Sequence, residues 1–164
     1  MKNNLESAGI RLILVLIELV FVGGLIYIRI QNFGWMALIF GIVLLLWVFF
    51  HLGLMVAFIV GARLSVLDAL LYLGVHFFYL LGWLMQSDGG DDGPVRWTIE
   101  VFYSSTPFND VLQKWGENLF WVGCIGAVIF YVVIGILLIV RLVVWLRARG
   151  KSTAVLEAVP LPAG

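Results

Sequence analysis

Four long apolar runs constrain this chain more than any other feature of its sequence. They cover residues 10–30, 35–60, 66–85 and 119–146. A helix rises about 1.5 Å per residue, so each run supplies the roughly 20 residues that a helix needs to cross a hydrocarbon core of about 30 Å. Because 63% of the residues are hydrophobic and only 12% are charged, a water-soluble fold could not bury all of the hydrophobic side chains. The sequence predicts an all-α membrane protein with four transmembrane helices in an antiparallel bundle.

The basic residues predict the orientation of this bundle. If successive spans alternate in direction, one side of the membrane receives Lys2, Arg11, Arg63, Arg147, Arg149 and Lys151, and the other receives Arg29, Arg96 and Lys114. Lysine and arginine are concentrated on the cytoplasmic side of membrane proteins. We therefore expect both termini in the cytoplasm and the acidic segment 87–118 outside it. We therefore predict a multi-pass protein located in a bacterial inner (plasma) membrane.

Little sequence remains outside the spans. Residues 1–150 are expected to form a single four-helix transmembrane domain. Residues 151–164 mix small, polar and proline residues without periodicity, and they are predicted to form a flexible cytoplasmic tail. The turn at residues 61–64 is so short that the second and third spans must be neighbours. Ser65 and Asp68 have the spacing of an N-cap at the start of the third span, which indicates a structural role for Asp68.

The segment between the third and fourth spans divides into three predicted parts. Residues 87–94 are rich in glycine and acidic residues and indicate a flexible linker. Residues 95–103 mostly alternate between apolar and polar, as in a half-buried strand. Thr106 and Pro107 then predict the start of a short amphipathic helix on the membrane surface. The strand has no predicted partner in this chain, so it either pairs with another chain or lies as an extended loop.

Small residues mark predicted helix-packing faces. Gly53, Ala57 and Gly61 recur at intervals of four in the second span, and Gly123 and Ala127 form a shorter series in the fourth. Such faces let two helices approach closely inside a membrane. The spacing leaves open whether the contact forms within one protomer or between protomers.

Both histidines of the chain lie within predicted spans. His51 and His76 are each about 12 residues from the middle of the short turn, so both are expected about 18 Å deep. Two imidazoles at one level can ligate a b-type haem through a neutral nitrogen. Their neighbours along each helix are mostly bulky, which favours a structural histidine pair or a histidine–tyrosine hydrogen bond. A proton or ion relay is the third interpretation.

Two charged residues also lie within predicted spans. Glu18 is inside the first run, and Arg141 is near the cytoplasmic end of the fourth. An isolated charge in the membrane costs several kcal/mol, so the sequence predicts that these two side chains form an intramembrane ion pair. The alternatives are an Arg141 side chain that extends to the interface and a Glu18 carboxyl that carries protons.

No catalytic motif or metal-ligand cluster is recognisable in the aqueous segments. The only cysteine, Cys124, excludes a thiolate cluster, and the zero net charge offers no argument for nucleic acid. The leading hypothesis is a non-catalytic subunit that packs with other subunits or copies of itself in a larger membrane complex, with no cofactor and no metal expected. The alternatives are a homo-oligomeric ion channel or membrane-perturbing effector, and a b-haem electron-transfer subunit that uses His51 and His76.

Overall fold

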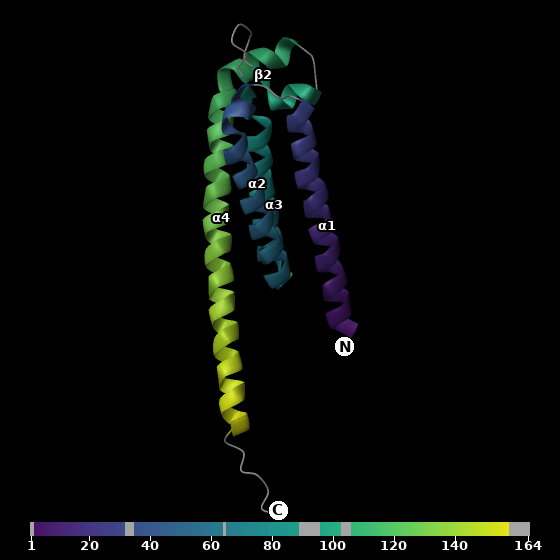
Figure 1. The fold of residues 1–164 in the computed structure, drawn as a ribbon, viewed down its shortest axis with the longest axis vertical. Helices are drawn as coiled ribbons and strands as arrows, with labels where there is room; N and C mark the ends of the chain where they lie inside the picture. The colour runs from purple at the N-terminus through teal and green to yellow at the C-terminus, as the bar shows by residue number, and fades with distance from the viewer. Residues whose placement is uncertain (1, 32–34, 64, 89–95, 103–105, 158–164) are drawn as a thin grey trace, which may run out of the picture.

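The fold was obtained as a computed structural model, which describes the chain except for residues 1, 32–34, 64, 89–95, 103–105 and 158–164. Four long helices dominate it (Figure 1). They are α1 (Lys2–Gln31), α2 (Trp35–Gly61), α3 (Val66–Leu84) and α4 (Thr106–Glu157). Between α3 and α4 lie the short strands β1 (Ser87–Asp88) and β2 (Arg96–Trp97) and the 3-10 helix η1 (Thr98–Phe102).

All four long helices are apolar enough to cross a membrane. The spanning segments are Ser7–Gln31, Gly41–Gly61, Val66–Leu84 and Asp110–Arg149. This confirms the prediction of a helical protein with four candidate membrane-spanning helices. Large apolar side chains cover the outer faces of these helices, where a hydrocarbon solvent would meet them.

The four helices extend along one long axis (Figure 1). The N-terminal end of α1, the turn between α2 and α3, and the C-terminal part of α4 point towards the lower end of the view. The strands and η1 lie at the upper end, so the helices are capped there by the segment that joins α3 to α4. The contact between α3 and α4 is the most extensive of the fold, and α1 packs mainly on α2.

The interior between the helices is apolar and rich in aromatic rings. Its buried residues are Val22, Leu25, Val48, Met55, Phe58, Val75, Tyr79, Trp83, Ala127, Tyr131 and Ile134. Every one of the four helices contributes to this set, so all four share this core. The rings of Trp47, Tyr79 and Trp83 pack on one another within it, with centroids 5.0 to 6.1 Å apart.

A close helix contact joins α3 to α4 at two glycines. A Cβ atom built on Gly123 would lie only 2.3 Å from the backbone nitrogen of Gly82. No other residue type fits there without moving a helix, and the next small residue along this face, Ala127, is fully buried. The predicted face of Gly123 and Ala127 therefore lies against α3.

The small residues of α2 lie elsewhere. A Cβ built on Gly53 meets no atom within 4 Å, and Ala57 is exposed. Only Gly61, at the end of the helix, comes near α4, where its built Cβ would lie 3.2 Å from the Leu138 side chain. This face thus takes little part in packing within the protomer.

The start of α3 has the predicted cap. The Ser65 hydroxyl accepts a hydrogen bond from the Asp68 amide at 3.2 Å, and the Asp68 carboxylate accepts from the Ser65 amide in return, which completes a capping box. Asp68 Oδ2 also accepts from the amide of Arg63 at 2.8 Å. The carboxylate therefore fixes both the turn and the first amides of the helix.

The segment between α3 and α4 corrects the predicted single strand. Of the predicted strand residues that the structure describes, only Arg96 and Trp97 are extended, and they pair antiparallel with Ser87–Asp88, whose position falls in the predicted linker. The chain then forms η1, with Thr98 buried and hydrogen-bonded to the Gln86 carbonyl. The strand thus has a partner within its own chain. Most of the predicted linker lies outside the described residues.

Helix α4 is longer than its apolar run. It begins at Thr106 and continues without a break to Glu157, so the predicted surface helix and the fourth span are one helix. The first part of the predicted flexible tail, as far as Glu157, is also helical. Residues 158–164 of that tail lie outside the described residues.

Polar contacts hold α1 to its neighbours at several heights. The Arg11 guanidinium donates to the carbonyls of Val60 and Ala62 at 2.8 and 2.9 Å. Higher up, the Trp83 indole donates to the Leu25 carbonyl at 2.9 Å. At the upper end Arg29 donates to the hydroxyl of Thr98 at 3.1 Å, which ties α1 to η1. These contacts fix α1, which packs less extensively on α2 than α3 and α4 pack on one another.

Candidate functional site

A carboxylate and two imidazoles meet in the middle of the bundle. Glu18 comes from α1, His51 from α2 and His76 from α3. The Nε2 atom of His51 lies 3.0 Å from Glu18 Oε1, and Nε2 of His76 lies 2.6 Å from Glu18 Oε2. Glu18 and His51 are fully buried, and the His76 side chain is 14% exposed. We call these three residues the central cluster.

Tyrosines surround the central cluster. The Tyr72 hydroxyl donates to Glu18 Oε2 at 3.1 Å. The Tyr131 hydroxyl is hydrogen-bonded to Nδ1 of His51 at 2.9 Å, and the Tyr79 ring stacks on the His51 ring with centroids 3.8 Å apart. Each polar side chain of the cluster is therefore held in one orientation by its neighbours.

The position of one proton follows from these contacts. Nδ1 of His76 lies 2.7 Å from the main-chain carbonyl of Tyr72. A carbonyl only accepts hydrogen bonds, so Nδ1 of His76 must carry a proton and donate it. In a neutral ring, Nε2 then presents a lone pair. That lone pair faces a carboxylate oxygen at 2.6 Å, and two acceptors so close repel one another unless a positive particle lies between them.

Glu18 Oε1 and His51 Nε2 form a second contact in the cluster. Both atoms are buried and 3.0 Å apart, but they do not align as a hydrogen bond. Nε2 carries the proton of a neutral His51 when the Tyr131 hydroxyl donates to Nδ1. The cluster thus contains one contact that needs an added cation and one that is poorly aligned, and both face the space shared by the three side chains.

This donor set fits a divalent transition-metal ion. One ligand atom from each of Glu18, His51 and His76 lies within 4.8 Å of the others. Two imidazoles and one carboxylate form a set used by catalytic zinc sites and by non-haem iron sites, which keep a further position open. Histidines that bind a metal through one ring nitrogen usually donate a hydrogen bond from the other to a carbonyl or a similar acceptor. The Nδ1–H group of His76 donates to the Tyr72 carbonyl in this way.

The central cluster does not fit a haem. In a bis-histidine haem both Nε2 atoms face the iron from opposite sides of the porphyrin plane. Here the ring centroids of His51 and His76 are 5.4 Å apart, the rings are inclined at 73°, and the Glu18 carboxylate contacts both Nε2 atoms. The carboxylate occupies the space that the porphyrin would need. The structure does bring the two histidines together, as their predicted depths indicated.

The structure does not bring Glu18 and Arg141 together. Arg141 instead forms an ion pair with Asp68 and donates to the Gly61 carbonyl at 3.2 Å. The guanidinium thus joins α4 to the turn between α2 and α3, and we call Asp68 and Arg141 the boundary pair. The predicted Glu18–Arg141 pair is corrected because each charge has a nearer partner, namely the histidines for Glu18 and the Asp68 carboxylate for Arg141.

Tyr72 and Tyr131 were not predicted from the sequence as site residues. Tyr72 lies one helical turn before His76 in the sequence, which is a usable signal because residues four apart share a helix face. No comparable signal exists for Tyr131, whose contact with His51 joins α4 to α2. Comparisons with protein-family models, curated proteins and solved structures find no match to this chain. The site is therefore interpreted from its own geometry.

Proposed function

We propose that this chain is an integral membrane metalloprotein whose central cluster binds one divalent transition-metal ion within the bundle. The observation that carries the proposal is the convergence of one ligand atom from each of Glu18, His51 and His76 on one space within the bundle. A divalent cation would bind the carboxylate and the Nε2 lone pairs of both imidazoles at once. Ionisable groups inside a membrane are costly and usually functional, so three of them in contact argue against a purely structural role.

The ion would have three protein ligands. Structural zinc sites are typically closed by four, whereas three ligands leave a position for water or a substrate. The Tyr72 hydroxyl, which donates to Glu18, and the Tyr131 hydroxyl, which contacts His51, would orient the ligands. We therefore assign the working chemistry of the protein to this ion and its open position.

A proton carrier is the second candidate, and the 2.6 Å contact between His76 and Glu18 favours it. A proton shared by these two groups would remove their repulsion. His51 can meet Glu18 Oε1 at 3.0 Å with its own Nε2 proton when Tyr131 donates to Nδ1, so a shared proton is also consistent with this contact. The metal site is the stronger proposal because ligand atoms from three helices converge on one space, whereas a shared proton needs only Glu18 and His76.

The proposal includes the placement of the protein in the membrane. Arg11 and Arg29 are 18 positions apart on α1, a rise of about 27 Å, which is close to the thickness of a hydrocarbon core. The boundary pair joins the end of α2 near Arg11, so these charges would lie at one interface, with Arg29 at the other. The bundle would then be antiparallel, with cytoplasmic termini and the η1 segment outside.

The predicted assembly with other subunits is compatible with this site. The face of Gly53 and Ala57 is open in the protomer and would suit a helix of a second copy or of another membrane protein. This assembly and the bacterial inner membrane stay predictions. The metal site itself would lie within one protomer and would not depend on them.

Metal analysis of the purified protein tests the proposal. The protein in mild detergent is incubated with Zn²⁺, Fe²⁺ or Mn²⁺ under anaerobic conditions, desalted and analysed for bound metal. We expect close to one ion per chain for the preferred metal, and loss of that ion in Glu18→Gln and His51→Ala. Glu100→Gln changes a carboxyl group in η1, outside the cluster, and serves as the matched control.

The result also separates the two candidates. Wild-type protein that retains no more metal than Glu18→Gln would overturn the metal proposal. If liposomes with that metal-free protein conduct protons and the Glu18→Gln variant does not, the proton carrier becomes the better description.

A further inference from the structure

Three guanidinium groups meet at the turn between α2 and α3. Arg141 of α4 donates to the Gly61 carbonyl at 3.2 Å. Arg11 of α1 donates to the carbonyls on either side of it, at 2.8 and 2.9 Å. The third group belongs to Arg63, which is in the turn itself and is exposed. We call these three residues the basic cluster.

The basic cluster carries more positive charge than its protein neighbours neutralise. Among the described side chains, only the Asp68 carboxylate pairs with it, through Arg141. The carbonyl end of α2 supplies the equivalent of about half a negative charge. More than one positive charge is therefore left over in the described part of the chain, and like charges so close together repel one another. An anion at the turn would remove this repulsion.

The basic cluster also has hydrogen-bond donors for an anion. A guanidinium group has five N–H donors, two on each terminal nitrogen. Each terminal nitrogen of Arg11 donates to one carbonyl and carries a second N–H that can donate elsewhere. The planar donor pairs of arginine match the spacing of phosphate oxygens. The basic cluster is therefore suited to a phosphate group.

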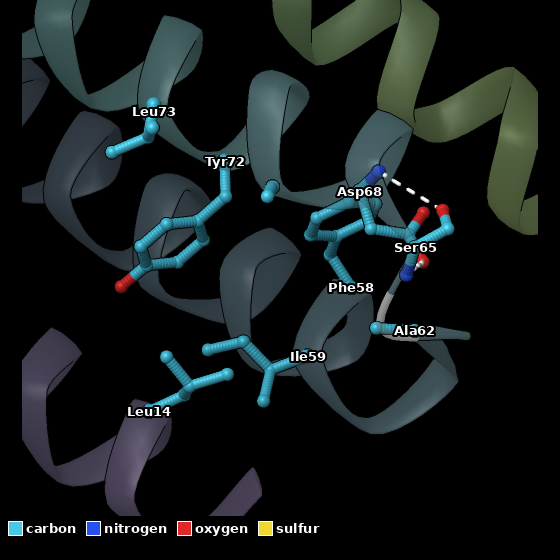
Figure 2. Close-up of a pocket in the computed structure, with 9 residues that line it drawn as sticks. Leu14, Phe58, Ile59, Ala62, Ser65, Asp68, Tyr72 and Leu73 are labelled. Atoms are coloured by element: carbon cyan, nitrogen blue, oxygen red, sulfur yellow. Dashed lines mark hydrogen bonds between the residues drawn. The ribbon is translucent and has the colours of Figure 1, made fainter. Parts of the chain in front are cut away.

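The backbone that carries Arg63 is held in one conformation. Its amide donates to Asp68 Oδ2 at 2.8 Å. Figure 2 shows Ala62, Ser65 and Asp68 together at the start of α3, with the hydrogen bond from the Asp68 amide to the Ser65 hydroxyl as a dashed line. An anion that binds here does not have to order the turn, which lowers the cost of binding.

The position of the turn relative to the other helices indicates which anion can reach it. Figure 1 shows that α1 and α4 both continue past the turn at the lower end of the view. On α4, residues 142–146 follow Arg141 directly, and these apolar side chains are 40% to 55% exposed. They rise about 7.5 Å, which is close to the depth of one headgroup layer. The space beneath the turn, between α1 and α4, therefore lies at the level of lipid headgroups.

We propose that the basic cluster binds the phosphate group of an anionic phospholipid, whose headgroup lies beneath the turn between α1 and α4. Basic pockets between transmembrane helices on the cytoplasmic side bind headgroups of this kind. A zwitterionic phospholipid carries its own cation beside the phosphate and would not neutralise the cluster. The inference rests on the proposed placement of the turn at a membrane interface, and it goes beyond the metal site.

Native mass spectrometry of the full chain tests the proposal. Delipidated protein in mild detergent is titrated with phosphatidylglycerol or phosphatidylcholine that have identical acyl chains. We expect one phosphatidylglycerol per chain to bind at least about fivefold more tightly than phosphatidylcholine, the effect of one basic residue near a membrane surface. Arg63→Gln should weaken phosphatidylglycerol binding about fivefold for the same reason and should leave phosphatidylcholine binding unchanged.

Arg147→Gln is the matched control. It removes the same charge from an exposed position of α4, six positions beyond Arg141. That separation is about 9 Å, roughly one screening length at physiological ionic strength, so phosphatidylglycerol binding should change less than about twofold. Equal losses in the two variants, or equal affinity for the two lipids, would overturn the proposal. Displacement of the lipid by water-soluble glycerophosphate would also overturn it, because the site would then recognise a free phosphate.

The metal content of the same samples keeps the two proposals apart. Arg63→Gln should bind metal as the wild type does, because Arg63 is outside the central cluster. Selective lipid binding in a protein that binds no metal supports the basic cluster and overturns the metal centre. Bound metal without lipid selectivity has the opposite meaning.

Discussion

The central cluster and the boundary pair contain the same kinds of groups in different arrangements. Both contain one buried carboxylate, which is Glu18 in the first and Asp68 in the second. Asp68 faces a permanent cation, and its second oxygen accepts from backbone amides, so its bonding capacity is used. Glu18 Oε2 contacts Tyr72 and His76, whereas Oε1 faces His51 at 3.0 Å without an aligned hydrogen bond. Neighbouring groups offset the cost of burying the carboxylate of Asp68 in full, and they offset that of Glu18 only in part.

This difference separates structural from functional charges in the bundle. A charge pair at a helix end that satisfies itself contributes to stability and to the position of the turn. Groups that converge without satisfying each other need an additional particle. We therefore expect substitutions in the boundary pair to change stability and substitutions in the central cluster to change metal binding.

The largest expected effect is loss of the ion when a ligand is removed. His76→Ala should weaken metal binding by more than the roughly 100-fold that a supporting residue can account for. Asp68→Asn should leave metal affinity unchanged, because Asp68 contacts Arg141 and the turn instead of the cluster. Competitive titration with a chromogenic chelator measures both affinities. Equal losses in the two variants would remove the distinction between the regions.

The next effect concerns the boundary pair. Arg141→Met leaves the Asp68 carboxylate buried without its cation, which should lower the free energy of unfolding by about 3 kcal/mol. The double variant Asp68→Asn, Arg141→Met removes both charges and should recover part of this loss. Unfolding in mixed detergent micelles, followed by circular dichroism, measures the cycle. Additive losses would mean that the two residues do not act as a pair.

A smaller effect is expected from the hydroxyl that supports His51. Tyr131→Phe removes the hydrogen bond to Nδ1 and should weaken metal binding about 10- to 100-fold. Stability should change little, because the ring remains in the core. Tyr27→Phe removes a hydroxyl from a side chain that is 64% exposed and is the control. Unchanged affinity in Tyr131→Phe would place this hydroxyl outside the working site.

The smallest effect is expected at the end of α2. Arg11→Met removes a cation and its hydrogen bonds to the Val60 carbonyl, at the end of α2, and to the Ala62 carbonyl just beyond it, and should cost about 1 kcal/mol. Arg11→Lys should restore part of the loss. Thermal unfolding in detergent measures both variants, and their metal content should equal that of the wild type. A change in metal content would show that the boundary influences the centre.

The four helices were predictable because each has a long apolar run and the solvent for such runs is lipid. The depth of the two histidines followed from the short turn, which acts as a common origin for α2 and α3. The true ends of α1 and α4 were not predictable from hydropathy, since both helices continue through polar residues. The pairing of β1 with β2 was missed because a strand of two residues has no periodicity to detect.

The partner of each charged side chain was harder to predict from the sequence. Asp68 was correctly expected to cap α3, but a carboxylate has two oxygens, and Oδ1 remained available for Arg141. Because Arg141 pairs with Asp68, the charged partners of Glu18 are the two histidines. Sequence alone gives the sign and approximate depth of each charge, whereas the pairing depends on which helices are neighbours and how they are rotated.

The contacts of α1 have one more consequence. Arg11, Glu18 and Leu25 are each seven positions apart, so they lie on nearly the same stripe of the helix, and all three contact neighbouring segments. A vertical slip of α1 by one residue, about 1.5 Å, would break the three sets of contacts together. Intermediate heights of this helix are therefore unfavourable, and the Glu18 carboxylate is either level with both imidazoles or detached from the whole stripe.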